Sequence, residues 1–155
     1  MPATQRMSIN DVDPKAYQAV LGLERYVHSG SLEQSLLAIV KIRASQINRC
    51  AWCLDMHVAE ARNAGVEQRK LDLIAAWQEA PALFSAREQA ALAFAEQVTL
   101  ISQGGVSDEV WAQVRAEFDE QGTVVLLMAV AAINVWNRMN VTAHTDLPAE
   151  PAVAG

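Results

Sequence analysis

Cysteine, histidine and aromatic residues are scarce in this chain of 155 residues. It contains two cysteines and three histidines, and phenylalanine, tryptophan and tyrosine together make up 6% of its residues. Two cysteines separated by two residues cannot link distant parts of a disulfide-rich secreted fold. The length suits one domain with a substantial core and makes two ordinary domains unlikely to fit.

Positive charge is also scarce, with twelve basic against eighteen acidic residues and a net charge of −6. This balance gives no electrostatic basis for binding phosphate backbones, so we expect no nucleic-acid partner. The N-terminal residues lack the apolar segment of a signal peptide, and no apolar run approaches the roughly 18 to 20 residues that cross a bilayer. We therefore expect a soluble, cytoplasmic protein without a membrane partner.

Helix signals follow one another along the chain, without alternating strand patterns or a glycine-rich phosphate loop. Apolar residues make up 52% of the chain, and alanine, leucine and valine supply most of them, which favours helices over sheet. Caps and breakers predict helices at 14–28, 31–48, 48–63, 66–79, 85–102, 107–118 and 123–140, although the start of the last could also form a short strand. The fold class predicted is an all-α bundle.

Capping patterns and prolines set the expected boundaries. Ser31 with Gln34 and Ser85 with Glu88 each fit a capping box. We expect residues 1–13 to form an N-terminal extension, 14–142 a single helical domain, and 143–155 a disordered tail, because the tail has two prolines and little to pack.

Both cysteines and one histidine lie in the stretch RCAWCLDMH, residues 49–57. On a helix, spacings of three and four residues place Cys50, Cys53 and His57 on one face. With Asn48 as N-cap, Cys50 falls in the first turn, where unpaired N–H groups and the helix dipole stabilise a thiolate. His57 can accept the proton of the Cys53 thiol. A disulfide between the two cysteines is sterically feasible.

Two other interpretations of the cysteine pair stay open. Cys-x-x-Cys is also half of a structural zinc site, but only His28 and His144 remain as further ligands and neither has suitable spacing, so we expect no metal. The cysteines could instead be inert core residues. We expect His28 and His144 to be surface residues without a catalytic task. Trp52, between the cysteines, is the one tryptophan that we expect near the site.

The stretch VKIRASQINRCAWCLDMH resembles the AhpD-like alkyl hydroperoxidases of the carboxymuconolactone decarboxylase superfamily. The segments EARNAGVEQRKLDLIAAWQEAP, AREQAALAFAEQVTLIS and AAINVWNR are similar to later helices of that subfamily, so the resemblance covers roughly residues 14–140. It implies an AhpD-like helical bundle that assembles as a homo-oligomer, a dimer, trimer or hexamer. An oligomer would also explain the uniformly apolar stretch near the C-terminus.

The resemblance also implies roles for the three site residues. Cys53 attacks a small-molecule hydroperoxide and becomes a sulfenic acid, Cys50 resolves it as a disulfide, and His57 belongs to the proton relay. A dithiol reductant, such as a thioredoxin-like or lipoyl carrier, then reduces the disulfide, and no metal or organic cofactor takes part. Helix position alone instead favours Cys50 as the more acidic thiol.

Several residues around the cysteines depart from the family pattern. The relay glutamate is expected twelve positions before Cys50, where this chain has Ala38. Trp52 replaces a histidine of the best-known peroxidases, and Arg49 replaces a frequent glycine. Glu24 and Asp55 are candidate replacement acids only by proximity in the sequence. Because losing a general base costs about 10² to 10⁴ in rate, we expect weak peroxidase activity.

The sequence thus predicts a thiol-dependent alkyl hydroperoxidase or disulfide oxidoreductase, with Cys53, Cys50 and His57 as its catalytic residues. The alternative is a non-catalytic redox-sensing or oligomeric scaffold, in which the disulfide forms without turnover. Decarboxylation of a lactone acid is a weaker alternative, since decarboxylase members of the superfamily work without the Cys-x-x-Cys pair.

Overall fold

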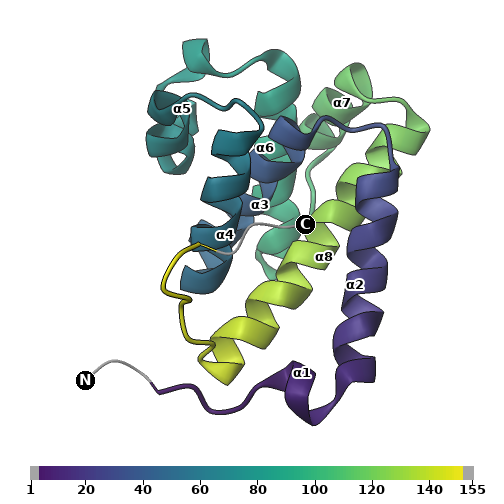
Figure 1. Cartoon of the computed structure of the whole chain (residues 1–155). Coiled ribbons are helices and arrows are strands. Elements are labelled where there is room, and N and C mark those ends of the chain that lie inside the picture. The colour runs from purple at the N-terminus through teal and green to yellow at the C-terminus, as the bar shows by residue number, and fades with distance from the viewer. Residues whose placement is uncertain (1–3, 152–155) are drawn as a thin grey trace.

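The computed structural model describes residues 4–151, and over this range the chain is helical and forms no strand, as Figure 1 shows. The all-α class predicted from the sequence is therefore confirmed. The α-helices are α1 (Ile9–Val12), α2 (Pro14–Ser29), α3 (Gln34–Asn48), α4 (Ala51–Asn63), α5 (Gln68–Leu73), α6 (Ala86–Thr99), α7 (Asp108–Glu117) and α8 (Glu120–Ala143). Short 3₁₀ helices span Ile74–Glu79, Pro81–Leu83 and Ile101–Gln103.

Helix α3 lies at the centre of the bundle, where it packs against α4, α6 and α8 (Figure 1). Its residues from Leu36 to Ile42 are all buried, so it has no solvent-facing side over two turns. Apart from Lys41 this stretch is apolar, and a helix with apolar residues on every side is stable in water only when neighbours surround it. The burial of α3 therefore fixes where the other helices pack.

Helix α8 is the long helix of 24 residues that packs against α2, α3 and α6. The segment that could have formed a short strand is helical. By length and composition α8 is apolar enough to cross a membrane, and it is the one such helix among the described residues. The expectation that no apolar run approaches the length needed to cross a bilayer is therefore not met by α8. Packing in the core accounts for the apolar character of α8, because Leu126, Val130 and Ile133 are fully buried.

Local capping rules place several helix starts correctly. The Asp13 carboxylate accepts hydrogen bonds from the backbone N–H groups of Lys15 and Ala16, and Pro14 occupies the first turn of α2. Ser85 and Glu88 form the expected reciprocal capping box at the start of α6. These signals hold because they involve only neighbouring residues.

The capping box predicted at Ser31 is wrong. The N-cap of α3 is Glu33, without a side-chain cap hydrogen bond, and the helix begins at Gln34. After α2 ends at Ser29, with Gly30 as its C-cap, the chain turns so that Leu32 enters the core, where it is 5% exposed. Burying this leucine keeps Ser31 outside the helix and delays its start.

The helix predicted over 66–79 is divided. Helix α5 ends at Leu73 and a 3₁₀ helix continues to Glu79, with non-helical backbone angles at Ala76 (φ −124°, ψ 30°). Trp77 accounts for the change, because its side chain is buried and its indole Nε1 donates to Glu96 Oε1 at 2.8 Å. A tertiary contact thus overrides the helical pattern.

The turn between α3 and α4 corrects the predicted N-cap. Asn48 is the last residue of α3, Arg49 adopts the left-handed conformation (φ 56°, ψ 43°), and Cys50 is the N-cap of α4. The Cys50 N–H donates to the carbonyl of Ser45 at 3.0 Å, which closes the end of α3. Asn48 does not cap α4 because it is itself the last helical residue of α3 and its side chain extends to α8, where Nδ2 donates two hydrogen bonds.

The predicted domain limits remain a prediction. The two flanks of the 14–142 region contact each other: the Arg6 N–H donates to the Ala143 carbonyl at 2.8 Å, and the Asp146 N–H donates to Gln5 Oε1 at 3.0 Å. Residues 1–3 of the expected extension and 152–155 of the expected tail lie outside the described residues.

Arg49→Gly should raise the free energy of unfolding by about 0.5–1 kcal/mol, because glycine adopts a positive φ without the Cβ penalty. Urea denaturation measures the change. Arg49→Ala is the matched control: it removes the same side chain but keeps Cβ, so it should bring no gain. Equal stability of the two variants would contradict strain at this turn.

Candidate active site

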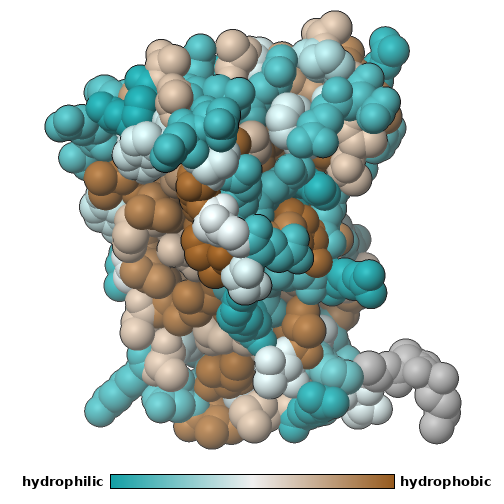
Figure 2. Space-filling view, turned by 180° about the vertical axis from the view of Figure 1, so that it is seen from behind, coloured by the Kyte–Doolittle hydropathy of each residue, from teal (hydrophilic) through white to brown (hydrophobic). Residues whose placement is uncertain are grey.

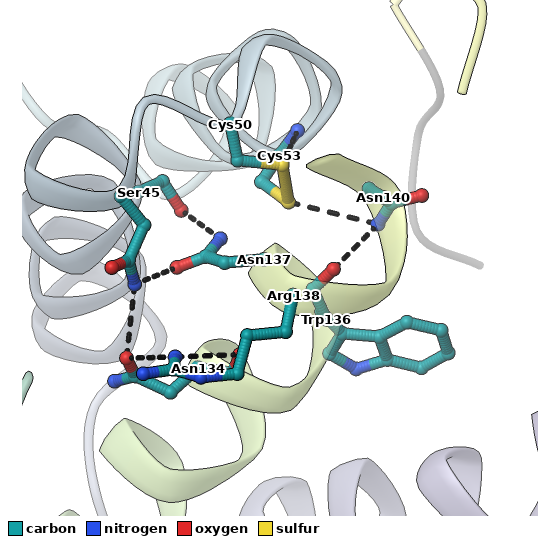
Figure 3. The surroundings of a disulfide bond; sticks show 9 residues. Ser45, Cys50, Cys53, Asn134, Trp136, Asn137, Arg138 and Asn140 are labelled. Atoms are coloured by element: carbon teal, nitrogen blue, oxygen red, sulfur yellow. Dashed lines mark hydrogen bonds between the residues drawn. A yellow bond between two sulfur atoms is a disulfide. The ribbon is translucent and has the colours of Figure 1, made fainter. Parts of the chain in front are cut away.

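Cys50 and Cys53 form a disulfide bond at the start of α4, with their Cα atoms 5.3 Å apart (Figure 3). Each cysteine is 1% exposed, and the pair packs against Ala44 of α3 and Ile133 of α8. The Cys50 Sγ also accepts a hydrogen bond from the Cys53 N–H at 3.3 Å. The structure therefore brings the two predicted cysteines together, with Cys50 at the positive end of α4.

The side chain of Asn140, which comes from α8, lies beside the disulfide (Figure 3). Its side-chain Nδ2 lies 3.7 Å from Cys53 Sγ and donates to the Trp136 carbonyl at 3.0 Å, which holds the amide in place. A donor in this position stabilises negative charge on the sulfur. Sequence reasoning missed Asn140 because no local pattern relates it to cysteines more than eighty residues earlier.

A network of partly and fully buried amides ties the cysteine-bearing turn to α8. The Asn48 Nδ2 donates to the side-chain oxygens of Asn134 and Asn137, both at 2.9 Å, and Asn137 donates to Ser45 Oγ at 3.0 Å. Asn137 is 1% exposed. Because an unpaired buried amide costs about 1–3 kcal/mol, these bonds fix the turn against α8.

His57 is buried one turn after Cys53 on α4, 2% exposed. Its Nδ1 lies 2.5 Å from Glu60 Oε2. Burial raises the pKa of Glu60, but the hydrogen bond and charge of His57 outweigh burial and hold that pKa below its ordinary 4.5. An ionised carboxylate accepts a hydrogen bond from Nδ1–H, so in a neutral ring Nε2 is left as the proton acceptor.

A second cluster of charged side chains is centred on Lys41, which is 1% exposed in the middle of α3. Its Nζ lies 2.7 Å from Glu24 Oε2 and 3.2 Å from His28 Nε2. Burial raises the pKa of Glu24, yet the hydrogen bond to His28 and the charge of Lys41 lower it to about 2. The other oxygen, Oε1, is buried without a hydrogen-bond partner within residues 4–151.

His28 is exposed, as expected, with 37% of its side chain accessible, but it is not isolated. It lies one turn after Glu24 on α2, where its ring joins the Lys41 group. Sequence reasoning also missed Lys41. The available signal was a lysine inside an otherwise apolar stretch, since a lysine is almost never fully buried unless it is paired. His144 ends α8 in the left-handed conformation and has no contact with the cysteines among the described residues.

Both charged groups face one cavity of about 720 Å³. Its apolar lining consists of Tyr17, Leu21, Leu37, Trp52, Met56 and Trp136. Its titratable lining consists of Glu24, Arg25, His28, Lys41, His57 and Glu60. Ala38 lies on the same wall, so the position of the expected relay acid opens onto the cavity, whereas Asp55 is not part of the lining.

A smaller cavity of about 180 Å³ lies beside Asn140 and the N-terminal segment. Tyr17, Trp52 and Trp136 line both cavities and form the wall between them. The rings of Tyr17 and Trp136 meet edge to face, 5.1 Å apart. Trp52 thus lies at the site, as the sequence suggested, and it also packs against the two cysteines.

Within residues 4–151, no three histidine, cysteine, aspartate or glutamate side chains are arranged to hold a metal ion. The expectation of catalysis without a metal or organic cofactor stays a prediction.

Comparison with known proteins gives a consistent family. Residues 14–97 match the Carboxymuconolactone decarboxylase family. The uncharacterized protein YdfG of Bacillus subtilis is 35% identical over 138 residues, which cover 89% of this chain and 93% of YdfG. The matches thus include the cysteine-bearing turn and most of the bundle.

Solved structures give the same result. ATU0492 of Agrobacterium tumefaciens, a protein of unknown function for which an AhpD role in antioxidant defence has been suggested, is 37% identical with a TM-score of 0.91; the match covers 95% of this chain and 100% of that chain. A peroxidase-related protein of Ralstonia eutropha with an AhpD core has a TM-score of 0.78 at 20% identity, covering 90% of this chain and 74% of that chain. The second likeness supports the fold alone.

Glu24→Gln should lower the free energy of unfolding by about 2–3 kcal/mol at pH 6. The lowered pKa of Glu24 means that its stabilisation is complete above about 4.5 and disappears as the pH falls to about 2. The difference between wild type and variant should therefore shrink over this interval in urea denaturation.

The control for this measurement is Glu67→Gln, which removes a negative charge at an exposed position without an ion pair in the described part of the chain. It should change stability by less than about 0.5 kcal/mol. A Glu24→Gln deficit that stays constant down to pH 2 would contradict the ion pair as its source.

Proposed function

This chain belongs to the AhpD-like branch of the carboxymuconolactone decarboxylase family, and from its site we propose that it is a thiol-dependent hydroperoxidase. The observation that carries the proposal is the Cys50–Cys53 disulfide, which lies one turn from a buried histidine at the wall of a cavity. A disulfide is the state that such a cycle reaches after the peroxide has oxidised both thiols.

The proposed cycle begins with the Cys53 thiol, whose proton passes to His57. The thiolate attacks one oxygen of the hydroperoxide, so that an S–O bond forms while the O–O bond breaks, and the alkoxide leaves and takes a proton from His57. Cys50 then attacks the Cys53 sulfenic acid, forming the disulfide and releasing water. A dithiol restores both thiols by thiol–disulfide exchange and is itself oxidised to a disulfide.

The surroundings of the two sulfurs support this division of roles. Cys53 has His57 one turn away as a base and the Asn140 amide 3.7 Å from its sulfur. Cys50, as the N-cap, receives the Cys53 N–H. A capped sulfur is a stabilised thiolate and a good leaving group. Attack by the reductant on Cys53 then releases Cys50, which suits Cys50 as the resolving thiol.

The cavity supports an organic hydroperoxide as substrate. A volume of about 720 Å³ falls within the range of small-molecule sites. Its aromatic and aliphatic side chains suit an alkyl or aryl group better than hydrogen peroxide. The reducing partner in this proposal is a small dithiol or a thioredoxin-like or lipoyl carrier. With Ala38 in place of the relay acid, turnover is expected to be slow.

We also propose that the chain works as a cytoplasmic homo-oligomer. Helix α8 exposes Val124, Leu127 and Val141, and Trp111 of α7 is 47% exposed. Figure 2 shows apolar patches on the face seen from behind Figure 1. Exposed apolar groups of this kind favour association between copies of a chain. The proposed assembly is a dimer, trimer or hexamer.

A redox-sensing scaffold is the second candidate. The observation that favours it is that both cysteines are 1% exposed, which restricts access by a reductant. Such a protein would be oxidised once per chain without continuing turnover. Lactone decarboxylation is not proposed, because decarboxylase members of the superfamily work without the cysteine pair.

Cys53→Ser should lower the rate of cumene hydroperoxide consumption with dithiothreitol by at least about 10²-fold, because the attacking sulfur is lost. Cys50→Ser should still form a sulfenic acid on Cys53, trapped by dimedone and read by mass spectrometry, but no intramolecular disulfide. Serine is a good N-cap, so circular dichroism should show an unchanged fold for this variant. Turnover that survives Cys53→Ser would refute the assigned roles.

A further inference from the structure

We propose that Glu60 replaces the acid missing at Ala38, and that it acts through His57 on Cys53. In the peroxide cycle this inference rests on the proposed function. The coupling of Glu60, His57 and Cys53 is a property of the reduced protein that can be measured without peroxide.

The three residues are aligned along one face of α4. Cys53, His57 and Glu60 occupy positions i, i+4 and i+7, which is two helical turns. Side chains on a helix lean towards its N-terminus. Glu60 therefore leans towards His57, as the 2.5 Å contact between Oε2 and Nδ1 records. The same helical geometry directs the His57 side chain towards the turn that carries Cys53. The order Glu60, His57, Cys53 is built into the helix.

The other two candidate acids, Glu24 and Asp55, do not hydrogen-bond to His57. The bonded oxygen of Glu24 is shared between Lys41 and His28, at 2.7 and 3.2 Å. Asp55 does not line the cavity. Within residues 4–151, Glu60 is the acid whose side chain hydrogen-bonds to His57. It is therefore the acid placed to orient the ring.

The charges facing this pair come from two other helices, α2 and α3. Burial has the largest effect on the pKa of Glu60 and raises it, whereas His57 lowers it. The charges of Lys41 on α3 and His28 on α2 lower this pKa further, by smaller amounts. Glu24 and Arg25 of α2 line the same cavity. The lowered pKa keeps Glu60 ionised at neutral pH, so that it can stabilise a protonated His57.

The chemical consequence is a transfer of one proton. The Cys53 thiol gives its proton to His57 Nε2, which leaves a thiolate and an imidazolium, and the Glu60 carboxylate compensates the new positive charge without gaining a proton. In the cycle, the imidazolium then protonates the departing alkoxide. Glu60 is thus a positioning residue: it fixes the tautomer of His57 and does not touch the peroxide.

The test measures the alkylation of Cys53 by iodoacetamide across the pH range, with mass spectrometry, in full-length Cys50→Ser protein where Cys53 is the only thiol. Glu60→Gln in this background should lower the rate at pH 7 about tenfold and move the pH midpoint to a higher value, because an opposite charge is lost. Asp55→Asn, on the same helix, removes an equal charge and should leave both unchanged. Glu60→Ala is measured in parallel and should shift the midpoint in the same direction.

Adding His57→Asn to the Cys50→Ser protein distinguishes an action of Glu60 through His57 from a purely structural role of Glu60. If Glu60 acts through His57, Glu60→Gln has no further effect in that variant. The proposal is overturned if Glu60→Gln matches Asp55→Asn, or if its effect is undiminished without His57. Turnover of cumene hydroperoxide by the chain with both cysteines is measured separately, so a shifted alkylation profile without turnover would refute the proposed function and leave the coupling standing.

Discussion

The attachment of Asn48 to α8 is the contact on which the site depends. Because this amide is shared with Asn134 and Asn137, α3 must end at Asn48, and the chain must reverse at Arg49. Cys50 then becomes the N-cap of α4 and lies within reach of Cys53. The same contact holds α8 against the turn and so places Asn140 at the sulfur. The half-buried amide of Asn48 thus determines where the redox pair and its neighbours lie.

Charge buried next to apolar surface is the second feature of the site. Lys41 and His57 are nearly inaccessible, and each is paired with a carboxylate, Glu24 or Glu60, at the cavity wall. Buried ion pairs seldom add much stability over apolar packing, since desolvation opposes them. Clusters of this kind are common where proton transfer is needed. The cavity therefore combines an apolar volume for an organic molecule with acid–base groups on one side, as the proposed chemistry requires.

The sequence was sufficient where local chemistry decides the outcome. The all-α class, the Asp13 and Ser85 caps and the closeness of Cys50 to Cys53 follow from neighbouring residues. The cap at Ser31 failed because burial of Leu32 sets the start of α3, and the cap at Asn48 failed because its amide binds α8. Such contacts join segments far apart in the chain, so no local pattern encodes them.

Local sequence patterns also identify only part of the site. Its cysteines and His57 share one helix and could be found from spacing. Lys41, His28 and Asn140 come from three other helices, and only the packed bundle brings them to the cavity or the sulfur. Glu60 could be found only in part from the sequence. Its spacing from His57 was visible there, but its proposed role depends on the absence of the relay glutamate at position 38, where this chain has alanine.

The most direct test of the central claim follows the thiols of the wild-type chain. Reduced protein is mixed with one equivalent of cumene hydroperoxide, and intact mass and free thiols are measured before and after adding a dithiol. The account predicts loss of both thiols with a mass decrease of about two hydrogens, reversal by the dithiol, and repeated cycles that consume hydroperoxide. Thiols that stay reduced in the presence of hydroperoxide, or one oxidation without further consumption, would contradict it.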